Sequence, residues 1–304
     1  MFCSDLARRA REPLAGTASH ALGCVLLGYP KRLWGRDALA SEGFSPELSS
    51  ELLRLVDERD VVTRLMAHEG TWTGRTEVVF FPEGLRFRDV AMDEVLALIS
   101  AARRGSLPEG GERQRDPIIL CCTHGQRDRC CALFGLAIVV ALRAALRPGA
   151  PIEIREASHL GGDRFAATAM VLPSGHTYGH LEPADAPALL TAASGGAPLV
   201  SRFRGSLWLE PAAQLAEAAA FALTEFRDLL PTLDPIEVSP IDRERCELRT
   251  KAQSGDHRVA IVVRCALEQR RVVGDCHNAD RHRTGQVGVW RVEEVLTSIP
   301  PPRV

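Results

Sequence analysis

The 304-residue sequence lacks the features that would assign it to a membrane, a secretory route or a nucleic acid. It has no run of about 18 apolar residues, which a membrane-spanning helix requires, and its N-terminus lacks the apolar core of a secretory signal. It has no basic excess either, because the formal net charge is −2 and the basic residues are spread along the chain. We therefore expect a cytoplasmic protein that binds neither membranes nor nucleic acid.

A disulfide framework is equally unsupported. The chain contains nine cysteines, an odd number, and no secretory signal, which favours reduced thiols or metal ligands. Hydrophobic residues make up 45% and charged residues 25%, as in ordinary globular proteins. The chain is too long for one small domain, and its length fits two compact domains with an appendage.

An internal repeat indicates the fold. Residues 79–84 and 170–175 align without a gap, and the same register places residues 98–102 over residues 189–193. Both halves therefore follow the order strand, Pro-x-Gly turn, strand, helix, and each opens with a strand and a helix. This order is that of a thioredoxin-like fold, so we expect an α/β protein with two tandem thioredoxin-like domains.

Three units are predicted along the chain. The polar, turn-forming residues 104–116 mark a linker, which gives an N-terminal thioredoxin-like domain without ligands at residues 1–112. The second thioredoxin-like domain, with the Cys/His site, covers residues 113–233. Residues 234–304 alternate in strand fashion and are predicted to form a small β appendage.

Four cysteines are clustered in residues 121–131, between a predicted strand and a predicted helix. Cys122 closes the strand, and Cys131 lies in or near the first helical turn, where the positive helix end stabilises thiolates. Cys121 alternates to the opposite face of the strand and is expected in the core. Because the first half has Leu-Gly-Tyr-Pro at this place, chemistry is expected in the second half.

A glycine-containing turn at residues 158–164 follows the strand that should lie beside the first one. It carries His159 and Asp163, four residues apart, so both side chains can face one pocket. Together with Cys122 and Cys131 they supply two thiolates, one imidazole and one carboxylate, which can hold Zn²⁺ or an iron–sulfur cluster. Each residue also has a structural alternative to metal binding. Cys122 and Cys131 can be core thiols, His159 can be a structural histidine, and Asp163 can form an ion pair with Arg164 or Arg127.

Three motifs resemble the sucrase/ferredoxin-like family. They are Cys-Thr-His-Gly-x-Arg-Asp-x-Cys-Cys-Ala at residues 122–132, Ser-His-Leu-Gly-Gly-x-Arg-Phe-Ala at residues 158–166, and Leu-Pro-x-Gly-x-x-Tyr-Gly at residues 172–179. The resemblance implies a tandem thioredoxin-like ferredoxin whose C-terminal copy binds a [2Fe-2S] cluster. In members with the full motif, the ligands are two cysteines with eight residues between them and a His-x-x-x-His pair.

The family pattern matches Cys122, Cys131 and His159, but Asp163 stands where the second histidine is expected. Aspartate is a hard, anionic ligand. In place of a neutral histidine it would make the cluster more negative by one charge and lower its reduction potential. Three other residues are candidates for the fourth ligand: Cys130, His176 and His180. A zinc site and the absence of any metal are the alternatives to a cluster.

The leading hypothesis is a [2Fe-2S] electron carrier or redox sensor that serves an unidentified redox partner protein. A thioredoxin-type thiol enzyme that uses Cys130 or Cys131 is the second hypothesis, although the sequence has no Cys-x-x-Cys motif. A non-catalytic protein, with zinc or without metal, is the third. Glycoside hydrolysis finds no support, because no carboxylate pair stands in a recognisable context for it.

Cysteines outside these motifs are given structural roles. Single thiols among apolar or strand-like neighbours are interpreted as core residues: Cys3, Cys24, Cys246 and Cys265. Cys276 and His277, with His282 nearby, lack a matching second half, so this segment is interpreted as an exposed polar turn.

Overall fold

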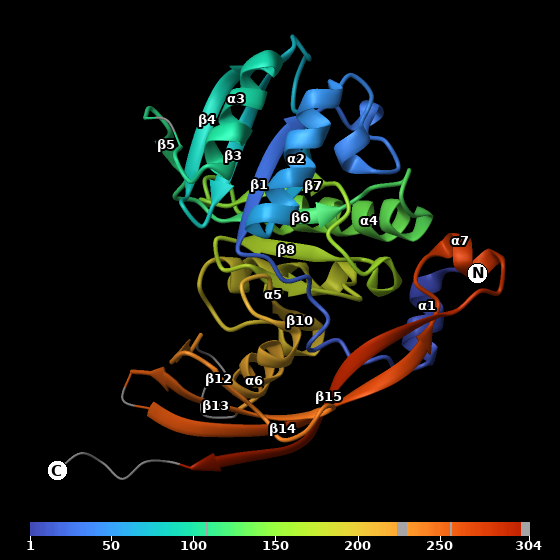
Figure 1. Cartoon of the computed structure of the whole chain (residues 1–304), viewed down its shortest axis with the longest axis vertical. Coiled ribbons are helices and arrows are strands. Elements are labelled where there is room, and N and C mark those ends of the chain that lie inside the picture. The colour runs from blue at the N-terminus through green and yellow to red at the C-terminus, as the bar shows by residue number, and fades with distance from the viewer. Residues whose placement is uncertain (108, 224–229, 256, 299–304) are drawn as a thin grey trace.

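The computed structural model describes residues 1–107, 109–223, 230–255 and 257–298, which form two sheets (Figure 1). The larger sheet has ten strands in the order β10-β9-β8-β6-β7-β2-β1-β3-β4-β5, and the smaller has five. None of the helices in this described part of the chain is long and apolar enough to cross a membrane.

The first half contains the predicted strand and helix order. Its elements are β1 (Gly23–Tyr29), α2 (Pro46–Arg59), β2 (Val61–Ala67), β3 (Arg75–Phe81), β4 (Leu85–Ala91) and α3 (Met92–Arg103). Strand β1 pairs in parallel with β2 and antiparallel with β3, which pairs antiparallel with β4. Helix α2 begins at Pro46 because the Ser45 hydroxyl caps it by accepting a hydrogen bond from the Leu48 backbone N–H.

The second half repeats this arrangement. Its elements are β6 (Ile118–Cys122), α4 (Arg129–Ala145), β7 (Glu153–Ala157), β8 (Ala169–Leu172), β9 (His176–Tyr178) and α5 (Ala186–Ala193). Strand β6 pairs in parallel with β7 and antiparallel with β8, and β8 pairs antiparallel with β9. The orders β2-β1-β3-β4 and β7-β6-β8-β9 are equivalent, so the α/β, thioredoxin-like fold class is confirmed.

The two halves share one sheet because β2 and β7 lie side by side. They pair antiparallel at Met66 and Ala157, and the next residue, Ser158, accepts a hydrogen bond from the Leu65 N–H through its hydroxyl. The sheet ends in β5 (Glu112–Arg113) on one side and in β10 (Phe203–Ser206) on the other. The loop that follows β7 therefore starts at the seam between the halves.

The N-terminal segment lies on the second half rather than on the first. Helix α1 (Cys3–Arg9) and the residues after it pair with the second half: Arg8 in the helix contacts Glu182 at 2.9 Å, and Glu12 beyond it contacts Arg164 at 2.7 Å. The predicted bounds at residues 112 and 233 remain a prediction.

The second sheet contains β11 (Thr232–Leu233), β12 (Glu237–Pro240), β13 (Arg245–Ser254), β14 (His257–Val272) and β15 (Gly285–Ser298). Helix α6 (Pro211–Phe221) covers it with apolar residues such as Leu215 and Ala216. On β13 and β14, Cys246 faces Cys265, with their sulfurs 3.0 Å apart. This strand-rich region corresponds to the expected appendage; residues 299–304 of that appendage lie outside the described residues.

Strands β14 and β15 of the second sheet form a long ribbon, and a short helix lies at the end of this ribbon. Helix α7 (Cys276–Asp280) joins the two strands, and Figure 1 shows it beside α1 and the N-terminus. Arg129, at the start of α4, forms a two-atom contact with Asp280, at 2.6 and 2.7 Å. Helices α1 and α7, 273 positions apart in the sequence, thus meet at the N-terminus of α4.

Candidate metal centre

Cys122 and Cys131 are brought together by the strand–turn–helix unit of the second half. Cys122 is the last residue of β6, and Cys131 lies in the first turn of α4, which Asp128 caps by accepting the Cys130 N–H. Helix α4 lies close against the strand end because Gly135 has no side chain there; a Cβ atom would overlap the carbonyl oxygen of Cys122. Both thiols are buried, with 1% exposure each.

The sulfur of Cys122 lies in a hydrogen-bonding environment that favours the thiolate. The neighbouring Cys131 thiol, with smaller effects from the backbone at His124 and Leu160, holds the pKa of Cys122 below its usual value against the opposing effect of burial. The same contact with Cys122 raises the pKa of Cys131. The negative charge of this pair is therefore favoured on Cys122.

His159 and Asp163 complete the predicted group. Oδ1 of Asp163 lies 2.8 Å from Nδ1 of His159 and 3.6 Å from Sγ of Cys131. Nδ1 is close to the carboxylate, but the angle between the two groups does not suit a hydrogen bond. Nδ1 of His159 therefore has no hydrogen-bond partner among the described residues. The structure thus brings all four sequence-predicted residues together, with His159 the most exposed at 29% of its side chain.

Two glycines shape the loop that delivers these side chains. Gly161 and Gly162 have φ values of 89° and 73°, in the left-handed region that favours glycine. A side chain at Gly162 would overlap the guanidinium of Arg204, which is buried and donates to the carbonyl of Gly161 at 2.9 Å. The turn that holds Asp163 in η3 (Asp163–Phe165) is therefore set against a buried arginine.

Arginine side chains surround the group. Arg127 Nε lies 3.4 Å from Oδ2 of Asp163, which leaves Oδ1 facing the thiol and the imidazole. Burial opposes ionisation of Asp163, but His159 and Arg127 outweigh it, and the pKa of this carboxyl lies below its usual value. Arg204 is close to Asp163, although burial lowers the Arg204 pKa to about 9. The aspartate is thus a carboxylate that both pairs with arginine and faces the site.

The other candidate ligands lie elsewhere. His176 is packed among aromatic rings, with centroids 5.5 Å from Phe203 and 5.4 Å from Phe221. His180 packs against Phe165 at 5.5 Å, and burial lowers the pKa of both histidines to about 4. The third candidate, Cys130, faces a different set of thiols.

A second group of metal-type side chains was not expected from the sequence. Cys3, Asp128, Cys130 and Cys276 are all buried, and their donor atoms lie within 4.8 Å of one another. The interpretation of Cys276 as part of an exposed turn is wrong, because it is 3% exposed, although His277 beside it is exposed. No sequence spacing signals this group, since Cys3 and Cys276 are 273 positions apart.

A pocket of about 220 Å³ adjoins His159 at the seam between the halves. Its lining includes Arg36, Arg64 and Arg127 in addition to His159 and Ser158. The exposed edge of the site therefore opens toward a basic recess that the first half helps to form.

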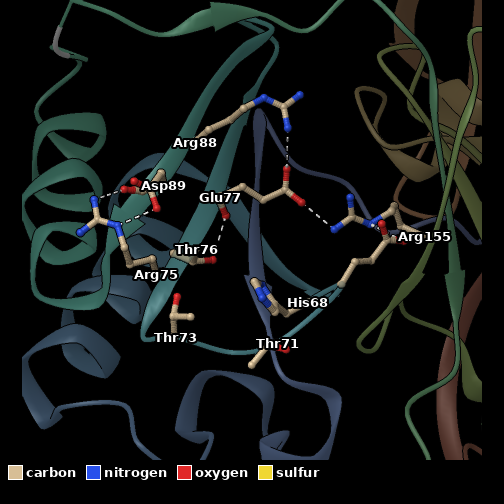
Figure 2. Close-up of a pocket in the computed structure, with 10 residues that line it drawn as sticks. His68, Thr71, Thr73, Arg75, Thr76, Glu77, Arg88, Asp89 and Arg155 are labelled. Atoms are coloured by element: carbon tan, nitrogen blue, oxygen red, sulfur yellow. Dashed lines mark hydrogen bonds and ion pairs between the residues drawn. The ribbon is translucent and has the colours of Figure 1, made fainter.

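A separate polar pocket of about 340 Å³ lies against β3 and β4 of the first half (Figure 2). Figure 2 shows Glu77 between Arg88 and Arg155, at 3.9 and 2.5 Å, and Arg75 beside Asp89 at 2.6 Å. The three arginines of this pocket are thus paired with carboxylates of the same chain, and none of the four candidate ligands lines it.

The sucrase/ferredoxin-like family model matches residues 14–205. The chain belongs to this family. The sucrase/ferredoxin-like match includes Cys122, Cys131, His159 and Asp163, whereas Cys3 and the second sheet lie outside it. Among solved structures, a thioredoxin-like [2Fe-2S] ferredoxin from Aquifex aeolicus is similar at 16% identity over 30% of this chain and 93% of that chain, with a TM-score of 0.27. No curated protein matches the sequence.

Proposed function

We propose that this protein is an electron carrier or redox sensor that binds a [2Fe-2S] cluster through Cys122, Cys131, His159 and Asp163. One observation carries the proposal: two segments of the second half bring these four groups together at a buried site. The thiolates would hold one iron and the imidazole and carboxylate the other.

The donor set fits such a cluster. The surroundings of Cys122 lower its pKa and so favour a thiolate ligand, and Nδ1 of His159 lacks a hydrogen-bond partner in the described part of the chain. When bound, the cluster supplies reversible one-electron chemistry. The protein excludes water with buried thiols, fixes the histidine and aspartate through the glycine turn, and offsets negative charge with Arg127 and Arg204.

The exposed edge suggests where an electron enters and leaves. His159 is the most exposed of the four ligands and borders the pocket at the seam, whose lining contains three arginines. A redox partner protein with an acidic surface near its own cofactor fits this edge, because opposite charges speed and orient encounter.

The burial of the thiols favours a cluster over a thiol enzyme. Cys130 and Cys131 have exposures of 0% and 1%, so neither sulfur can reach a disulfide in another protein without local opening. Reactive thiols in exchange reactions need access as well as a low pKa.

Anaerobic purification followed by iron and sulfide analysis, visible absorption and EPR after reduction tests the proposal. We expect two irons and two sulfides per chain, an orange-brown colour, and a reduced EPR signal that Cys122→Ser abolishes. Cys121→Ser is the matched control, since Cys121 lies on the same strand but belongs to the other core cluster, with Ile119 and Ile138. A colourless protein without iron after reconstitution would contradict the proposal.

A further inference from the structure

A cluster of three thiols and one carboxylate lies beside the candidate [2Fe-2S] site but is distinct from it. Cys3 comes from α1, Asp128 and Cys130 from the start of α4, and Cys276 from α7. Successive helical residues point about 100° apart, so Cys130 faces this group while Cys131 faces Cys122. The cluster therefore joins three segments that the chain would otherwise leave separate.

The spacing of the sulfurs is that of ligands on a single ion. Sγ of Cys3 lies 3.4 Å from Sγ of Cys130 and 3.7 Å from Sγ of Cys276. In a tetrahedral zinc site with Zn–S distances of about 2.3 Å, two sulfurs are about 3.8 Å apart. Oδ2 of Asp128 lies 3.7 Å from Cys3 Sγ, and the carboxylate and the three sulfurs all lie within 4.8 Å of one another, so the carboxylate can serve as the fourth ligand.

The carboxylate is already fixed for such a role. Oδ1 of Asp128 accepts the Cys130 N–H at 2.9 Å, and Oδ2 accepts the Cys276 N–H at 2.7 Å. These hydrogen bonds hold the carboxylate between the thiols, as outer contacts hold ligands in metal sites. The nearby Arg129 pairs with Asp280 at 2.6 Å and also interacts with the Cys276 thiol, so its single positive charge is shared and does not balance three thiolates and a carboxylate.

We propose that Cys3, Asp128, Cys130 and Cys276 bind one structural zinc ion that clamps α1 and α7 to the N-terminus of α4. The site is closed, with four protein ligands and exposures of 0 to 4%, which is typical of structural rather than catalytic zinc. Binding displaces the thiol protons to solvent and stabilises the folded arrangement of α1 and α7 against α4. This site is independent of the proposed electron-transfer function, and two of its ligands lie outside the matched family segment.

Metal analysis of the full chain and of three variants tests the zinc site. The wild-type protein should hold one zinc ion in addition to any iron, and Cys276→Ser should lose zinc while retaining iron, sulfide and the EPR signal. Cys122→Ser should show the reverse. Cys24→Ser, which alters a buried thiol outside both groups, should retain both metals.

Cobalt binding provides a test that needs no variant. Metal-free wild-type protein titrated with Co²⁺ should develop the charge-transfer and ligand-field bands of tetrahedral cobalt with thiolate ligands, and zinc should displace the cobalt.

If Cys276→Ser folds poorly, Cys276→His, which restores a ligand, should recover zinc binding.

The outcomes separate this inference from the proposed function. Absence of zinc and of the tetrahedral cobalt spectrum in protein that contains iron and sulfide would overturn the zinc site alone. Loss of iron together with zinc in Cys276→Ser would also overturn it, because it would indicate one cluster shared by both groups. Zinc without iron or sulfide, even after reconstitution, would support the zinc site and contradict the ferredoxin function.

Discussion

Asp163 and His159, four residues apart in one turn, face each other with Oδ1 of the aspartate 2.8 Å from Nδ1 of the histidine. The same carboxylate oxygen lies 3.6 Å from the Cys131 sulfur. The aspartate that departs from the family motif therefore points into the site rather than away from it. Its second oxygen contacts Arg127, which partly offsets the added negative charge.

Replacement of this aspartate should change the cluster potential. Asp163→His substitutes a neutral ligand for an anionic one, so the potential should rise, by on the order of 100 mV, as measured by EPR-monitored redox titration. Asp163→Asn, which also removes the charge but is a poor ligand, should lose iron instead. Equal shifts in the two variants, with iron retained, would show that residue 163 acts only through its charge.

Removal of the arginine beside Asp163 should act in the opposite direction. Arg127→Gln deletes a positive charge that favours the reduced, more negative cluster, so the potential should fall by on the order of tens of millivolts. The shift should shrink at high salt because the Arg127 side chain is 37% exposed. Arg147→Gln is the control: this exposed residue lies past the C-terminal end of α4, about 25 Å along the helix, and should leave the potential unchanged.

A methyl group at Gly135 should loosen the strand–helix unit that carries both cysteines. The added Cβ would overlap the Cys122 carbonyl, which outweighs the better helix propensity of alanine, so Gly135→Ala should lower the free energy of unfolding by about 3 kcal/mol. Denaturant unfolding measures this. Leu136→Ala, at a residue 48% exposed on the same helix, should change it by no more than about 0.5 kcal/mol. A stabilised Gly135→Ala variant would contradict the close packing.

A buried carboxyl in α6 should make stability depend on pH. Burial raises the pKa of Glu217 from 4.5 to about 7, so its contribution is fully present below pH 4.5 and is lost as pH rises through 7. From pH 5 to 8 the wild-type protein should therefore lose about 2 to 3 kcal/mol relative to Glu217→Gln, whose amide oxygen can still accept the Ser206 N–H. Thermal or urea unfolding at both pH values checks this.

The exposed Glu237 provides the control for that pH series. Glu237→Gln should follow the wild-type pH profile. His176 lies 3.8 Å from Glu217, but burial lowers its pKa to about 4, so it stays neutral between pH 5 and 8 and does not contribute to the comparison. Parallel pH profiles for wild type and Glu217→Gln would contradict the raised pKa.

Local patterns in the sequence determined the repeated fold and the first candidate site. The cap at Ser45, the strand that ends at Cys122 and the helix that follows Asp128 depend on neighbours a few residues away. The glycine turn that carries His159 and Asp163 is equally local. Because parallel strands in a βαβ unit bring their carboxyl ends to one edge, these segments were predicted to meet, and they do.

Only the tertiary structure showed the direction of Asp163, the shared sheet and the second thiol cluster. The direction of the Asp163 carboxylate depends on Arg127 and on the buried Arg204 beneath the turn. The spacing of residues in the sequence does not show that these two arginines lie there. Cys3 and Cys276 stand alone in the sequence, and they meet because a long β14–β15 ribbon returns the C-terminal region to α1 (Figure 1). A contact across 273 positions depends on the length and path of the intervening elements, so it has no local periodicity that the sequence could display.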